Sequence, residues 1–542
     1  MPTGSDSWSD AAPQTGRLIH LRGHQAAEQL LADLTRVDRH SPQFQALAAR
    51  ALSLGRPLLA AIVRHLDCAE PQILSTLGQL IMNYPVRTQA VQALVRVAND
   101  RRAPDGRRLG AMTLLWNYYL HPMAVDDFLA RLQSPARSMA VALVRAVEEC
   151  YRDRELLREY HGFFEALYTQ PPDILHGIVS VLAEMPGAGA TGALQLLALH
   201  PYPAIMHEAI EALAGRPAAG GLRALAVLEP NLPAEAAHVV SRLLHKHRLS
   251  GYYQDPLLPA NSRCRALVSA IDPMGARVLW LQVPSELKDK EVALMGLVLS
   301  DLAGVVESVG LPACPTGNFA APAPIGTVHR VVGRRLPGHA ANLAAVSCLE
   351  VPFSYGLQLL REAVALNWQE GMGLPPEYRL LMHTVWRFAA DAPMHEHVQV
   401  RDLLDPAAVE HEVDLWSHQL FEGWYFESEA VRQVAQQVAT SKGGGSAGLT
   451  EDNWQVLLPS IIRLAQEEFG PRVRVLYARR LWRMAEWLWF AGRVHEAGLA
   501  ASVAHTMEQS PPEANLSVIR LVQRGVLKAL REIRGAADRG QV

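Results

Sequence analysis

The chain has 542 residues, of which 49% are apolar and 19% are charged, a balance that is typical of folded proteins with an ample core. Its formal net charge at pH 7 is -3, so the whole chain lacks the positive excess that marks proteins bound to nucleic acid or to anionic membranes. The five cysteines form no CxxC pair, which argues against a disulfide framework and against a cysteine-ligated zinc site.

The sequence carries no targeting or membrane signal. Residues 1–19 show no basic-then-apolar pattern and are predicted to form a disordered tail. No uncharged apolar run approaches the roughly 18 residues that a membrane span needs. We therefore expect no membrane association and a location in the reducing cytoplasm.

Residues 20–250 repeat with a period of about 31 residues, and prolines mark the repeat. The prolines that open the repeats are Pro42, Pro71, Pro104, Pro135, Pro172, Pro203 and Pro233. Proline suits a first helical turn because the N–H that it lacks would have no partner within the helix. A second series of prolines follows about 14 residues later in most repeats, so each repeat is predicted to contain two short helices.

This pattern resembles the HEAT-like repeat family, including its short bacterial version. The stretches that carry the resemblance are AVQALVRVAND (90–100) and HEAIEALAGRP (207–217), where small residues interrupt an apolar helical stripe. The resemblance implies an α-solenoid, in which stacked helix pairs leave a long concave surface for a protein partner. It also implies rarer roles, because some bacterial members assist attachment of bilin chromophores and a few bind nucleic acid.

The clearest β signal lies in residues 264–283 (CRALVSAIDPMGARVLWLQV), where two apolar arms flank a turn at 272–275. The apolar run 291–300 predicts a third strand, and we expect a small β-hairpin-containing module over 262–349. The stretch 302–310 (LAGVVESVG) fits either a short helix or a further strand. Residues 312–326 are rich in Pro, Gly and Ala and are predicted to form a long surface loop.

The module holds the only candidate ligand-binding residues, which are Asp301 at the end of the third apolar run and the pair Arg334 and Arg335. An arginine pair binds phosphate or carboxylate well, although solvated turns also carry such charges. The sequence lacks a P-loop and the HExxH spacing, and its two GxGxxG matches fall in a helix–helix turn and in a glycine-rich break. We therefore predict no catalytic residue, no metal site and no cofactor.

The remaining sequence divides into a helical region with an acidic segment (350–440), a flexible Gly-rich linker (441–449) and C-terminal helices (450–542). The stretch WLWFAGRVHEA (487–497) is similar to a tetratricopeptide helix pair. The last predicted helix (514–534) carries a basic face.

The sequence thus predicts a mainly α chain, with a HEAT-like α-solenoid, a small β-containing (α+β) module and a C-terminal helical region. The favoured function is a non-catalytic scaffold or adaptor that binds protein partners through the concave surface of the solenoid. One alternative is a ligand- or chromophore-handling enzyme or accessory factor with its site in residues 262–349. A second alternative, nucleic-acid binding, rests on the basic C-terminal region.

Overall fold

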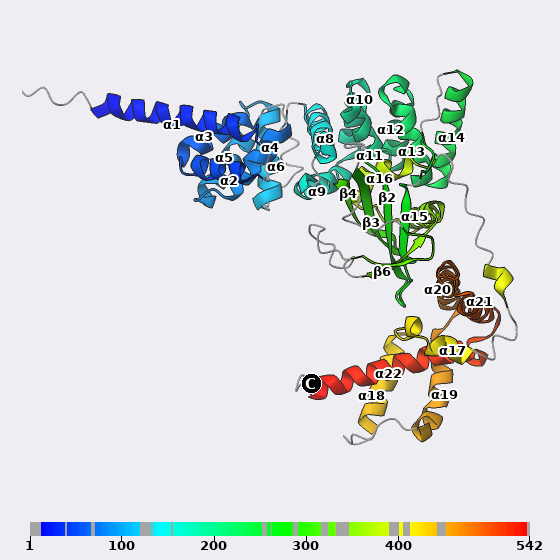
Figure 1. The fold of residues 1–542 in the computed structure, drawn as a ribbon. Coiled ribbons are helices and arrows are strands. Elements are labelled where there is room, and N and C mark those ends of the chain that lie inside the picture. The colour runs from blue at the N-terminus through cyan, green and yellow to red at the C-terminus, as the bar shows by residue number, and fades with distance from the viewer. Residues whose placement is uncertain are drawn as a thin grey trace, which may run out of the picture. The chain divides into compact units, whose positions relative to one another are not determined.

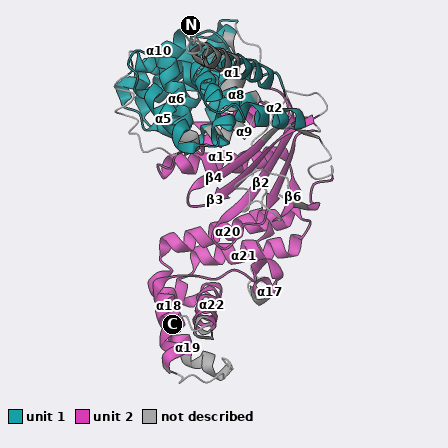
Figure 2. Cartoon of the chain, turned by 90° about the vertical axis from the view of Figure 1, so that its left-hand side faces the viewer, with its two compact units in different colours: residues 1–230, 234–256 teal, residues 231–233, 257–542 magenta. Residues whose placement is uncertain are grey.

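The structure, a computed structural model, has two compact units (Figure 2). Unit 1 comprises residues 1–230 and 234–256, and unit 2 comprises residues 231–233 and 257–542. The residues that the structure describes are 12–37, 41–66, 71–119, 132, 134–152, 155–251, 257–261, 263–285, 291–315, 323–331, 346–389, 400–404, 412–441 and 451–538. Their secondary structure confirms a mainly α chain with one β-containing part.

The described elements of unit 1 are helices (Figure 1). Their bounds are α1 (Ala12–Leu34), α2 (Pro42–Leu52), α3 (Arg56–His65), α4 (Pro71–Met82), α5 (Arg87–Asn99), α6 (Asp105–Tyr119), α8 (Pro135–Arg152), α9 (Glu155–Tyr168), α10 (Pro172–Glu184), α11 (Ala188–Leu197), α12 (Pro203–Ala214), η1 (Pro217–Ala219), α13 (Gly221–Leu228) and α14 (Ala234–Leu249). Five of these helices begin at a proline that was predicted to open a repeat, namely α2, α4, α8, α10 and α12. Ser41 caps α2, where its Oγ accepts the Phe44 N–H at 3.1 Å.

The helices between α10 and α14 alternate in their exposure to solvent. In α11 every residue from Gly189 to Leu197 is buried, and in α13 all residues except Arg223 are buried. A helix that is apolar on all sides belongs in the interior of a fold. The helices α10, α12 and α14 instead bury one stripe each and leave polar residues at the surface.

Unit 2 contains a six-stranded antiparallel sheet with the order β4-β3-β2-β1-β6-β5. The strands are β1 (Arg265–Ser269), β2 (Ala276–Pro284), β3 (Glu291–Ser300), β4 (Gly304–Pro315), β5 (Val328–Val331) and β6 (Val346–Val351). The predicted hairpin and third strand are confirmed as β1, β2 and β3, and the ambiguous stretch 302–310 contributes to β4. The strands β5 and β6 were not predicted. The prediction of a loop over residues 312–326 is wrong at 312–315, because these residues pair with the start of β3 and end β4. Residues 316–322 lie outside the described residues, and 323–326 belong to no strand or helix.

The two faces of this sheet pack differently. Leu279 and Leu281 lie on the face that meets α15 (Phe353–Gln369), where Gly356 allows the helix backbone to come close. The opposite face holds a buried cluster of Leu267, Val278, Trp280 and Cys348. This alternation along each strand follows from the period of two in an extended chain.

The other helices of unit 2 follow the sheet in the sequence. They are α16 (Pro376–Trp386), η6 (Val400–Leu403), α17 (Glu412–Ser417), η8 (Gln419–Phe421), α18 (Glu429–Ser441), α19 (Glu451–Glu468), α20 (Pro471–Phe490), α21 (Val494–Gln509), η9 (Pro512–Ala514) and α22 (Leu516–Asp538). The predicted C-terminal helix pair is confirmed as α20 and α21, with Gly492 at a φ of 73° in the turn. Across the described chain, no single helix has both the length and the apolar character needed to cross a membrane.

We expect Gly296→Ala to destabilise unit 2 by roughly 1–3 kcal/mol, because overpacking a tight core forces side chains out of place. A Cβ at this position would lie 2.6 Å from Cζ3 of the buried Trp280 ring. Urea unfolding followed by tryptophan fluorescence measures the effect, since nine of the eleven tryptophans belong to unit 2. Gly373→Ala is the control, because its Cβ would meet nothing within 4 Å; equal midpoints for both variants would contradict the packing described.

Candidate functional site

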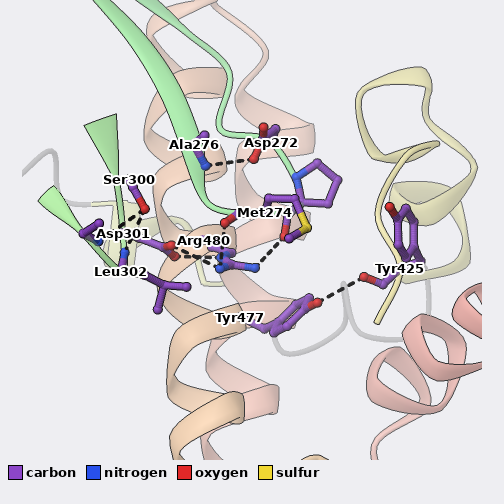
Figure 3. A network of polar contacts seen from close by, with 11 residues as sticks. Asp272, Met274, Ala276, Ser300, Asp301, Leu302, Tyr425, Tyr477 and Arg480 are labelled. Carbon is purple, nitrogen blue, oxygen red and sulfur yellow. Dashed lines mark hydrogen bonds and ion pairs between the residues drawn. The ribbon is translucent and has the colours of Figure 1, made fainter. Parts of the chain in front are cut away.

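Asp301, the predicted site residue, lies in the turn between β3 and β4. Its backbone N–H donates to the Gly275 carbonyl at 3.0 Å, which joins this turn to the turn between β1 and β2. Its side chain is only 8% exposed and forms a two-pronged ion pair with Arg480 of α20. Arg480 Nε lies 2.7 Å from Asp301 Oδ2, and Nη2 lies 3.1 Å from Oδ1 (Figure 3).

The rest of the Arg480 guanidinium caps the turn between β1 and β2. Nη1 donates to the Pro273 carbonyl at 2.5 Å, and Nη2 donates to the Met274 carbonyl at 3.1 Å. The guanidinium also lies 5.0 Å from the centre of the Tyr477 ring, one turn earlier on α20. We call Asp301, Arg480 and these two carbonyls the latch, because together they fix α20 to two turns of the sheet.

The sequence of the first turn explains why it accepts the latch. Asp272 Oδ1 accepts the Ala276 N–H at 2.8 Å, a local bond that closes the turn between β1 and β2. Gly275 has a φ of 84°, a conformation that favours glycine. A Cβ there would also overlap the Asp301 carboxylate. Because it has glycine at this position, the Asp-Pro-Met-Gly turn leaves space for the Asp301 carboxylate to pack against it.

Asp301 also lines a cavity of about 310 Å³ within unit 2, which we call the arginine cavity. The end of the sheet, α15 and α20 form its walls. Its polar and charged lining residues are Arg277, Ser300, Asp301, Glu362, Gln369, Arg479, Arg480 and Arg483. Its apolar lining includes Ile271, Leu299, Leu359 and Leu366. The volume lies at the lower end of the range of small-molecule sites.

Two carboxylates neutralise Arg483, one of the cavity arginines. Arg483 forms an ion pair with Glu362 of α15, and its Nη1 lies 2.8 Å from Glu486 Oε2. The same Glu486 oxygen accepts the Tyr355 hydroxyl at 2.7 Å. Burial alone would lower the pKa of Arg483, but the charges of Glu486 and Glu362 outweigh it and leave that pKa raised.

Arg277 and Arg479 have no such partners. Within the described chain, neither guanidinium has a carboxylate within 4.0 Å or a hydrogen-bond acceptor in range. Arg277 is half-buried near the start of β2, whereas Arg479 is exposed on α20. Burial lowers the pKa of Arg277, and the nearby positive charge of Arg483 lowers it further. The cavity therefore holds more positive charge than its own carboxylates balance.

The structure describes one of the three predicted site residues. It uses Asp301 in a structural ion pair that also forms part of the cavity wall, while Arg334 and Arg335 lie outside the described residues. Sequence reasoning missed all four cavity arginines. One signal was available, because Arg480 lies on the helical stripe whose neighbours Tyr477, Leu481 and Met484 are buried. A charged residue on such a stripe requires a partner.

Other chemistry has little support in the described residues. No group of three or more His, Cys, Asp or Glu side chains there is close enough together to hold a metal ion. Comparisons with family models, with curated proteins and with solved structures find no match to this chain.

We expect Arg480→Met to destabilise unit 2 by roughly 3–5 kcal/mol, because it leaves the Asp301 carboxylate buried without its counter-charge. The matched control is Arg463→Met, which breaks an exposed pair with Glu467 at 3.8 Å and is expected to cost well under about 1 kcal/mol. Urea unfolding midpoints measure both changes.

A double variant tests whether the two latch residues act together. Arg480→Met combined with Asp301→Asn is expected to be more stable than the sum of the single losses implies, because no buried charge is left unpaired. Additive losses would show that Asp301 and Arg480 are not coupled.

Proposed function

We propose that the chain is a non-catalytic protein-binding scaffold in which the helices of unit 1 form a HEAT-like α-solenoid. The observation that carries the proposal is the alternation of exposure from α10 to α14. Because α11 and α13 are buried over almost their whole length, they offer little surface to a partner. The surface that remains open belongs to α10, α12 and α14, which we call the first-helix row (Figure 1).

The first-helix row presents charged side chains in an ordered way. The helices α10 and α12 expose the acidic residues Asp173, Glu184 and Glu211. The helix α14 exposes Arg242 and Lys246 among several histidines. His176 Nδ1 lies 2.5 Å from Glu208 Oε2 and links α10 to α12. A surface that changes sign along its length favours partners with the opposite order of charge.

Two further observations concern the cellular location of the protein and the alternative function of nucleic-acid binding. Cys150, Cys264 and Cys348 are free thiols, which supports the proposed cytoplasmic location. Nucleic-acid binding through the C-terminal region has weaker support, because α22 uses two of its basic residues internally. Arg524 Nη1 donates to the Phe421 carbonyl at 2.5 Å, and Lys528 Nζ lies 3.2 Å from Glu427 Oε2.

Ligand handling by the β-containing part of unit 2 is a second candidate function, because the arginine cavity lies there beside the predicted residue Asp301. Its polar lining has uncompensated positive charge rather than a set of catalytic groups. We therefore take this candidate as ligand binding and not as catalysis.

We expect the pair Glu211→Arg and Arg242→Glu to reduce capture of a native partner by about tenfold or more, because each change places like charges across the interface. Affinity capture from a cytosolic extract, with partners quantified by mass spectrometry, measures the loss. The control exchanges the exposed pair of α19, Arg463→Glu with Glu467→Arg, and likewise preserves net charge.

Deletion of residues 20–250 provides the stricter test of the scaffold. The partners that depend on the first-helix row are expected to disappear from the captured set. If every partner survives both the deletion and the charge exchange, unit 1 is not the binding surface.

A further inference from the structure

We propose that the arginine cavity is a binding site for a small organic anion, whose carboxylate or phosphate group is held by Arg277 and Arg479. The proposal rests on the second candidate function, ligand handling by unit 2, and is independent of the first-helix row. Three features support it: the net positive charge of the cavity, the environment that disfavours the positive charge of Arg277, and the mixture of arginine and apolar side chains in the lining.

The charge balance follows from the ion pairs. Four arginines line the cavity, and two of them are engaged: Arg480 by Asp301, and Arg483 by Glu362 and Glu486. Arg277 and Arg479 then remain as two positive charges that no carboxylate of the described residues approaches within ion-pair distance. Because Arg483 is paired with two carboxylates, the four arginines and three carboxylates leave a net charge of +1, which an anion with one negative charge would balance.

The environment of Arg277 disfavours its positive charge. It lies half-buried on β2, next to Leu299 of β3, with Arg483 as a positive neighbour. The negative charges of Glu486 and Glu362 act in the opposite direction, yet the pKa of Arg277 remains lowered. A guanidinium stays protonated in proteins, so an arriving anion relieves this unfavourable charge instead of competing with a carboxylate already in place.

The lining of the cavity indicates the chemical character of the ligand. An arginine fork matches the oxygen atoms of carboxylate and phosphate groups, which is why arginine recognises both. The side chains of Ile271, Leu299, Leu359 and Leu366 add an apolar lining. A volume of about 310 Å³ exceeds what an inorganic oxyanion fills, so we infer an anionic group on a small apolar body.

Isothermal titration calorimetry on the full chain tests the site with phenyl phosphate, benzoate, inorganic phosphate and the neutral benzyl alcohol, all at constant ionic strength. We expect saturable binding of phenyl phosphate or benzoate, weaker binding of inorganic phosphate and no binding of benzyl alcohol. Preference for phenyl phosphate assigns a phosphate ligand, and preference for benzoate assigns a carboxylate ligand. Absence of binding for all three anions would overturn the proposal.

Variants locate the binding. Arg277→Gln is expected to weaken binding of the preferred anion by roughly tenfold or more, and Arg277→Lys by less, because lysine keeps the charge without the fork. Arg472→Gln is the matched control, since Arg472 is exposed on the same helix as Arg479 but does not line the cavity. Equal weakening by Arg277→Gln and Arg472→Gln would show non-specific attraction and overturn the site.

The comparison of affinities requires that the variant folds like the wild-type protein. Unfolding midpoints show whether Arg277→Gln retains the wild-type fold. If it does not, Arg479→Gln at the exposed position provides the same comparison, with several-fold weaker binding expected. Unchanged affinity in a folded Arg479→Gln variant would remove Arg479 from the site. The first-helix row variants are expected to bind the anion normally, so failure of the scaffold proposal would not be mistaken for failure of this one.

Discussion

A buried guanidinium holds the site region of unit 2 in place. Arg480 is only 5% exposed, and a buried arginine must find acceptors for its N–H groups as well as a counter-charge. Asp301 supplies the charge, and the carbonyls of Pro273 and Met274 accept further hydrogen bonds. Because these acceptors lie in two different turns of the sheet, the latch fixes where α20 lies against the sheet.

The latch also determines which charges meet in the arginine cavity. Arg479 precedes Arg480 on α20, and Arg483 follows it by one helical turn, so a fixed α20 brings both toward Arg277. Arg480 thus stabilises the fold through its ion pair with Asp301, whereas Arg277 and Arg479 have no carboxylate of the described residues within ion-pair distance. A group in a cavity whose pKa is shifted by burial and by a neighbouring charge, as that of Arg277 is, is a candidate for a binding site.

The sequence predicted local features well and long-range ones poorly. The arms of the β1–β2 hairpin and the prolines at helix starts are local signals, and both were confirmed. The strand β6 was missed because its six residues pair with β1, about 80 positions earlier in the chain. The partner of Asp301 was missed for the same reason, since Arg480 lies 179 residues away. Asp301 lines the arginine cavity, but its carboxylate is engaged by the ion pair with Arg480.

We propose that unit 2 carries an anion site, and α20 forms one wall of its cavity. Hydrogen–deuterium exchange of the full chain, with and without whichever of phenyl phosphate and benzoate binds more tightly, is the test of this site. We predict slower amide exchange on ligand addition in β2, α15 and α20, with no change in the helices of the first-helix row. Slower exchange confined to segments outside these three elements, or no change anywhere, would contradict the account.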